Sequence, residues 1–114
     1  MADDNTPKNL WEADSTHPEI AAELREHLRE INDPELGLNI IQLGLVRDVS
    51  IKEDSVLVKM ILTTPYCPYG PALLEMSRKK VEEITGKPTT IEYTMEAWDF
   101  SMMEDGAAEE WGFF

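Results

Sequence analysis

The stretch Val56–Pro71, VLVKMILTTPYCPYGP, decides the fold. It begins with a nearly continuous apolar run, which is typical of a central strand covered on both faces. A loop follows in which prolines and a glycine fix the path of the backbone, and this loop carries Cys67, the only cysteine of the chain. Pro71 suits the first turn of a helix. The stretch therefore predicts a strand, a stiff loop that presents one thiol, and a helix.

The segments on either side of this stretch predict the rest of a sheet. Residues 45–52 alternate between apolar and polar side chains, and with a polar turn at 52–55 they predict a β-hairpin with the strand at 56–63. The predicted helix runs from Pro71 to a stop at Gly86, and a third strand starts at Pro88. A right-handed crossover returns this strand parallel to the second one, so the sheet is expected to be mixed.

A first helix is predicted before the hairpin. Thr16 with Glu19 has the spacing of a capping box, Pro18 suits the first turn, and an apolar stripe continues to a predicted end near Asn32. The expected fold is therefore α+β: an α-β-β-α-β two-layer sandwich with a small mixed sheet. We expect residues 16–114 to form a single domain after a flexible acidic arm over residues 1–15.

The last 19 residues, 96–114, are rich in aromatic and sulfur-containing side chains. A weak helical pattern over residues 101–111 predicts a short C-terminal helical tail. So many large apolar side chains are not expected to stay in water. They are expected to pack on the chain's own core or on a partner.

The composition excludes several classes of partner. The chain of 114 residues has a net charge of -13, and such a surface repels nucleic acid and anionic membranes. No apolar run approaches the length of a membrane span, no signal peptide pattern is present, and a single cysteine cannot form an internal disulfide. These features predict a soluble cytoplasmic protein.

The residues alone leave three roles open for Cys67: metal ligand, nucleophile, or inert core side chain. The start of the following helix favours a thiolate. A nucleophile needs a base, and the only histidines are His17 and His27, both in or beside the first helix. A metal cage needs more thiolates than one chain supplies. A cluster would have to be shared between protomers of a homodimer, or completed by a client protein, by glutathione, or by carboxylates such as Asp33 and Glu35.

Three motifs in this order carry a family resemblance. The chain resembles the iron-sulfur cluster assembly domain first catalogued as domain of unknown function fifty-nine, which includes the SufT and PaaD proteins. The resemblance covers about residues 18–111. The motifs are Ile31-Asn32-Asp33-Pro34-Glu35, the run Leu36 to Val46 with Leu43-Gly44-Leu45-Val46 at the strand start, and Leu62-Thr63-Thr64-Pro65-Tyr66-Cys67-Pro68.

The resemblance implies the α-β-β-α-β fold and a non-enzymatic role in maturing iron-sulfur proteins. The family's motif residues fall on Asp33, Glu35, Thr64, Cys67 and Trp98, although Glu96 and Ala97 stand where many members have prolines. We expect Cys67 to be the sulfur ligand of a transient cluster or iron. Asp33 and Glu35 are expected to support it or to bind iron transiently, and Thr64 to donate a hydrogen bond to the thiolate. Asp33, Glu35 and Cys67 should then lie near one another at one end of the sheet.

The expected partners are client apoproteins or other cluster-assembly proteins. Two alternatives stay open. One is a scaffold or adaptor that binds clients through the C-terminal aromatic tail without metal. The other is a PaaD-like factor dedicated to an aromatic-ring oxygenase pathway.

Overall fold

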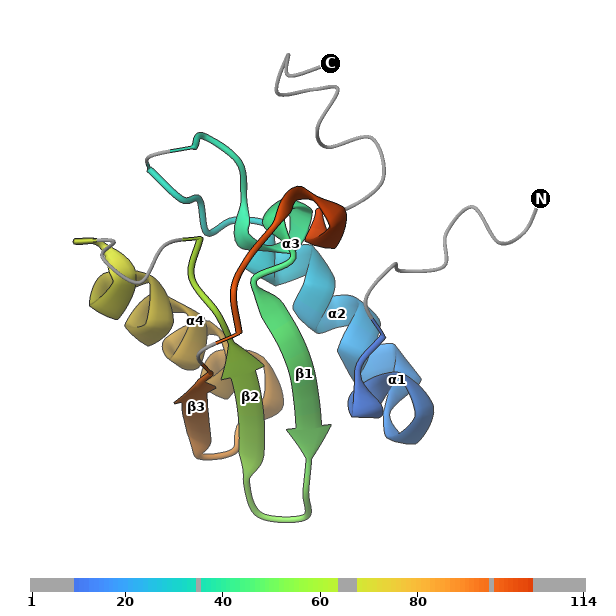
Figure 1. Ribbon diagram of the computed structural model, residues 1–114. Coiled ribbons are helices and arrows are strands. Elements are labelled where there is room, and N and C mark those ends of the chain that lie inside the picture. Colours follow the sequence, from blue (N-terminus) through green and yellow to red (C-terminus); the bar gives the residue numbers. More distant parts are fainter. Residues whose placement is uncertain (1–9, 35, 64–67, 95, 104–114) are drawn as a thin grey trace.

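The computed structural model describes residues 10–34, 36–63, 68–94 and 96–103, with the side chain of Phe100 left out. Helices pack on one face of a three-stranded sheet, with α2 and α4 behind the strands in Figure 1. The elements are α1 (Glu12–Thr16), α2 (Pro18–Leu28), α3 (Ile40–Leu43), β1 (Val46–Ile51), β2 (Val56–Met60), α4 (Gly70–Thr85), β3 (Thr89–Tyr93) and a 3-10 helix η2 (Phe100–Met102).

The sheet has the predicted topology. β1 pairs with β2 in antiparallel and β2 pairs with β3 in parallel, in the order β1-β2-β3. The alternation along β1 breaks at Val46 and Arg47, and the register of the β1–β2 ladder shifts between Val46 and Asp48. Alternate β2 residues Val56, Val58 and Met60 are buried toward the helices. The α+β sandwich with a small mixed sheet is confirmed.

The start of the domain differs from the prediction. Trp11 and Ala13 fall within the predicted acidic arm, yet both are buried, and α1 packs against α2 and β1. The guanidinium of Arg25 lies 3.9 Å from the centroid of the Trp11 ring and forms an ion pair with Asp14. The folded domain therefore begins before residue 16, and the remainder of the predicted arm, residues 1–9, lies outside the described residues.

The helix boundaries also differ from the sequence pattern. Thr16 ends α1, so His17 takes the N-cap position of α2 and no side chain caps this helix. The predicted capping box between Thr16 and Glu19 is wrong. The end of α2 at Leu28 comes earlier than the predicted end near Asn32, because the chain turns through hydrogen bonds from Glu30 N to His27 O and from Ile31 N to Leu28 O.

A short helix, α3, connects the turn after α2 to the first strand. Asn39 caps it by accepting a hydrogen bond from Gln42 N at 2.7 Å, and the Gln42 side chain accepts one from Asn39 N. Gly44 ends it with a positive φ of 74°. A Cβ at Gly44 would overlap the carbonyl oxygen of Met102, so η2 passes directly over this glycine, as Figure 1 shows for the red segment beside α3.

The described part of the C-terminal tail packs on the chain itself. Met103 is buried and Trp98 is partly buried against the core. The indole nitrogen of Trp98 donates to Leu43 O at 2.7 Å. The tail therefore contacts the α3 end of the domain. The helical pattern predicted for residues 101–111 becomes a 3-10 turn in its described part, and residues 104–114 lie outside the described residues.

Candidate functional site

The predicted site lies only partly within the described residues. Glu35, Thr64 and Cys67 fall outside them. Asp33 and Trp98 are described, as are the residues that carry the cysteine loop on both sides, Thr63 and Pro68. The site can therefore be built from the Asp33 turn and from the two stems of the loop.

The turn after α2 buries its aspartate. Asp33 N donates to Leu38 O at 2.9 Å and Gly37 N donates to Asp33 O at 2.8 Å, which closes the turn. Pro34 prevents the residue before it from continuing a helix, and Gly37 supplies a positive φ of 74°. The Asp33 side chain is only 1% exposed, and its Oδ1 accepts a hydrogen bond from Leu36 N at 3.3 Å. The turn thus points a carboxylate inward.

The second oxygen of this carboxylate contacts the start of the cysteine loop. Thr63 Oγ1 lies 3.5 Å from Asp33 Oδ2 and donates to it. Thr63 was not among the predicted site residues, and the structure brings its hydroxyl to Asp33, while the predicted Thr64 lies outside the described residues. The sequence carried no signal for this contact, because the direction of the Thr63 side chain depends on where β2 ends.

The two stems of the cysteine loop lie side by side. A Cβ added at Gly70, the first residue of α4, would come 2.6 Å from Leu62 Cδ1. Leu62 is itself buried, whereas Pro68 and Tyr69 at the end of the loop are exposed. The two ends of the loop therefore lie close together. In Figure 1 the Asp33 turn and the start of α4 lie at the same end of the molecule.

The remaining candidate groups are placed elsewhere on the domain. Trp98 binds the last carbonyl of α3 as described above. His17 lies between α1 and α2, and His27 Nδ1 lies 3.6 Å from Glu30 Oε2 on the surface. Within the described ranges no group of three or more His, Cys, Asp or Glu side chains is arranged to hold a metal ion. None of the helices that the structure describes is long and apolar enough to cross a membrane.

Comparison with known proteins identifies the domain. The sequence pattern of the family described as iron-sulfur cluster assembly protein matches residues 21–93. A protein of Porphyromonas gingivalis named Fe-S protein maturation auxiliary factor is 40% identical over 89 residues, which cover 75% of this chain and 85% of that protein. A Synechocystis protein named iron-sulfur cluster carrier protein is 37% identical over 59 residues, which cover 52% of this chain but only 17% of that longer protein.

A solved structure agrees with these matches at the level of the fold. The crystal structure of a domain of unknown function, DUF59, from Bacillus anthracis superposes with a TM-score of 0.76 at 23% sequence identity, covering 88% of this chain and 98% of that one. The fold, the matched family pattern and the relative that aligns along most of its length agree. The chain belongs to the iron-sulfur cluster assembly protein family.

Proposed function

We propose that this protein is an auxiliary factor in the maturation of iron-sulfur proteins, which carries a cluster or directs it to client apoproteins and is not itself an enzyme. The observation that carries the proposal is the match to the Porphyromonas maturation factor, because it spans 85% of that protein at 40% identity. The Synechocystis protein supports an iron-sulfur cluster as the cargo, because it is named a cluster carrier and a region resembling this chain forms part of it. In this proposal the cluster is cargo that passes through the protein.

The chemistry of the chain's single thiol supports Cys67 as the point of attachment of the cluster. Soft thiolates are the preferred ligands of iron in clusters, and a single thiolate leaves the other ligands to a partner. Such incomplete ligation suits release better than storage. The adjacent stems Leu62 and Gly70 bring the two ends of the loop together.

Burial of Asp33 bears on its role. A carboxylate that is 1% exposed, with contacts to Leu36 N and Thr63 Oγ1, is better suited to holding the loop than to binding iron directly. We therefore propose that Asp33 supports the cysteine loop. The transient binding of iron by Glu35, a hydrogen bond from Thr64 to the thiolate and a binding role for Trp98 stay predictions.

Anaerobic reconstitution tests the carrier form of the proposal. The wild-type protein and Cys67→Ser are incubated with iron and sulfide, desalted, and compared by absorption spectroscopy and by iron content. Cluster retained by wild type and lost by Cys67→Ser is the expected result. Equal absence from both proteins contradicts the carrier form. The cluster content of a [4Fe-4S] client in cells lacking this protein then tests the targeting form, which requires that content to fall.

The proposed role of Asp33 has its own test. Asp33→Asn should change the alkylation rate of the single thiol, Cys67, because the hydrogen bond to Thr63 weakens when the acceptor loses its charge. Asp54→Asn is the matched control, since Asp54 is exposed in the turn between β1 and β2. Identical alkylation rates across the pH range for wild type, variant and control would show that Asp33 does not act on the loop.

Partners are proposed from the same family membership. Client apoproteins or other cluster-assembly proteins are the expected class, and a homodimer sharing a cluster, the adaptor role of the tail and a pathway-specific PaaD-like role stay predictions. The adaptor alternative depends on residues 104–114, because Trp98 and Met103 already contact the domain. A cytoplasmic location stays a prediction from the single cysteine.

A further inference from the structure

The two edges of the sheet differ in how they are covered. Along β1, the indole nitrogen of Trp11 donates to Val46 O at 3.3 Å, and Glu12 N donates to Asp48 Oδ1 at 2.8 Å. Ser50 Oγ also donates to Glu12 Oε1 at 3.0 Å. Helix α1 therefore covers this edge, which is one of the ways proteins prevent unwanted strand pairing. β3 forms the opposite edge, and no strand pairs with its outer side in the part of the chain that the structure describes.

The hydrogen bonds of β3 define which backbone groups face outward. Val56 N donates to Pro88 O, and Thr94 N donates to Met60 O, both at 2.9 Å. Because backbone groups alternate in direction along a parallel strand, even-numbered residues of β3 bond to β2 and odd-numbered ones point away from it. Thr89 fits this pattern, because its N–H points away from β2 and donates to Glu82 Oε2 of α4 at 3.1 Å. The N–H and C=O groups of Ile91 and Tyr93 therefore point outward, where a further strand would bind.

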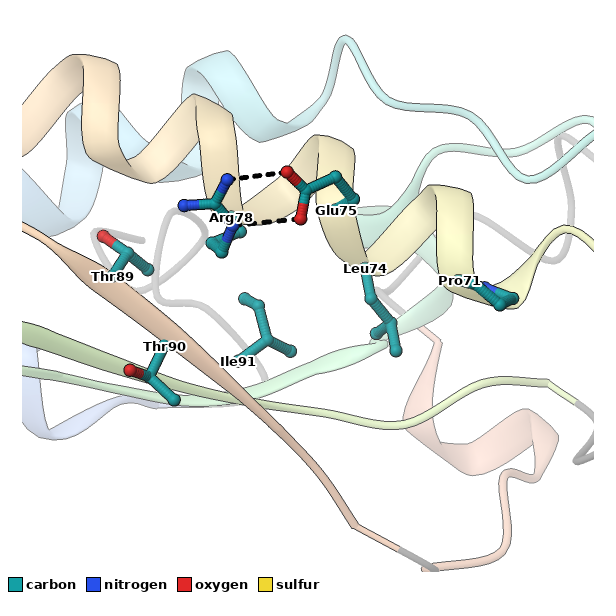
Figure 2. Close-up of a pocket in the computed structure, with 7 residues that line it drawn as sticks. All are labelled: Pro71, Leu74, Glu75, Arg78, Thr89, Thr90 and Ile91. Atoms are coloured by element: carbon teal, nitrogen blue, oxygen red, sulfur yellow. Dashed lines mark hydrogen bonds and ion pairs between the residues drawn. The ribbon is translucent and has the colours of Figure 1, made fainter.

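A groove lies beside this edge, between α4 and β3 (Figure 2). Its volume is about 370 Å³. The close-up shows Leu74 of α4 and Ile91 of β3 extending toward the same space. Its lining residues are Pro71, Leu74, Glu75, Arg78, Thr89, Thr90 and Ile91. A side chain that enters the groove from an added strand would therefore meet an apolar floor.

The charges around the groove favour a basic partner. Arg78 is engaged by two carboxylates, Glu75 at 2.6 Å and Glu82 at 2.8 Å, and the hydrogen bonds from Arg78 lower the pKa of Glu75. Glu92 is exposed, and as the neighbour of Ile91 its side chain points to the sheet face opposite the helices, where its partner in the ladder is Lys59 of β2 and its other side faces the open edge. With a net charge of -13, the chain also repels acidic segments, including copies of itself.

We propose that the outer edge of β3 and the α4–β3 groove bind an extended segment of a partner protein in which apolar and basic side chains alternate. The backbone of the segment pairs with Ile91 and Tyr93 as a fourth strand. Its apolar side chains then face the groove, and its basic side chains lie on the other face, where they meet Glu92. That the partner is a client or an assembly protein rests on the proposed function, but the existence of the binding edge does not.

Titration with a designed peptide tests this binding. The probe is the acetylated, amidated hexapeptide Thr-Val-Lys-Val-Lys-Thr, added to the full-length protein and followed by backbone amide chemical shifts in NMR. The amide signals of Ile91 and Tyr93 should move most, with smaller changes at Leu74. The same peptide methylated at alternate backbone nitrogens should bind at least about tenfold more weakly, because it loses the donors that pair with the edge. Shifts that are absent, or that are centred on another element, would overturn the proposal.

Two variants separate the backbone from the charge contribution. Tyr93→Pro removes an outward-facing donor without removing a hydrogen bond to β2, and proline is tolerated on edge strands, so binding should be lost while the β2 ladder persists. Glu92→Lys should weaken binding of the lysine peptide about threefold and favour the matched peptide with Glu in place of Lys. An unchanged preference for the lysine peptide in Glu92→Lys contradicts the proposed register, even if Tyr93→Pro does not fold. Concentration-dependent shifts of the same amides without peptide would assign the edge to a second copy and overturn the proposal.

Discussion

Substitution of Gly44 by alanine should destabilise the protein far more than the same substitution at Gly37 or Gly86, which also have a positive φ. Gly44 and Gly37 both have a φ of 74°, so alanine introduces about 1–2 kcal/mol of backbone strain at either position. At Gly37 a new Cβ meets nothing within 4 Å, whereas at Gly44 it overlaps Met102 O and lies 2.9 Å from the carbonyl carbon of Met102. Backbone atoms cannot rotate away, so η2 must shift.

The cost of that shift follows from what η2 holds in place. Displacing it weakens the hydrogen bond from Trp98 to Leu43, which contributes about 1 kcal/mol, and exposes part of Met103, whose full burial contributes about 1.5–3 kcal/mol. We therefore expect Gly44→Ala to lower the free energy of unfolding by about 3–5 kcal/mol and Gly37→Ala by about 1–2 kcal/mol.

Urea denaturation followed by tryptophan fluorescence and by far-UV circular dichroism measures both values. Gly86→Ala is a second control, since Gly86 has a φ of 70° and a Cβ added there also meets no atom within 4 Å. Equal losses of stability for Gly44→Ala and the two controls would refute the packing of η2 on α3.

Three further changes test how the termini are fastened to the domain. Trp11→Ala should lower the free energy of unfolding by about 3–5 kcal/mol in urea denaturation, because it empties a buried site and removes the ring beneath Arg25. A loss under about 1 kcal/mol would mean that α1 is not part of the folded core. Asp14→Asn should cost about 1 kcal/mol at pH 7, because the hydrogen bond from Arg25 lowers the pKa of Asp14 in the folded state. That contribution is fully present above the unfolded pKa of about 3.9 and is lost as the pH falls through the lower folded value, so wild type and variant should converge in acid; a gap that persists there would contradict the assignment. Trp98→Phe should cost about 1 kcal/mol, because it leaves Leu43 O without its indole donor, and thermal denaturation of the variant measures the loss.

The strands and the long helix could be predicted because their signals are local. Alternation along β1, the apolar run of β2 and the proline and glycine at the two ends of α4 each depend on neighbouring residues. The parallel third strand followed from the handedness of crossovers. These features required no knowledge of contacts between distant parts of the chain.

Helix α1 was missed because its stabilising contacts are distant in sequence. Trp11 reaches Val46 across 35 residues, and Asp14 reaches Arg25 across 11. A stretch of five residues has no periodicity to detect. The predicted cap at Thr16 failed for the same reason, since α1 already occupies that residue. By contrast, α3 did carry a local signal in Asn39 and Gln42, which have the spacing of a capping box.

In the candidate site, too, local features could be predicted from the sequence and contacts between distant residues could not. Proline and glycine predicted the turn at Asp33, and the resemblance joined this turn to the cysteine loop. The contact of Asp33 with Thr63 could not be predicted, because it depends on where β2 ends and on the direction of the Thr63 side chain. The closeness of the predicted ligands Glu35 and Cys67 to Asp33 stays a prediction.

Burial of residues on both sides of the family pattern has a consequence for anyone who expresses this domain in pieces. The family pattern covers residues 21–93, but Trp11 and Ala13 lie before it and Met103 lies after it, and all three are at most 4% exposed. A fragment cut at the limits of the family pattern would leave their binding surfaces on α2, α3 and β1 open to water. Such a fragment should aggregate, and its failure to bind a cluster or a client would say nothing about the intact protein.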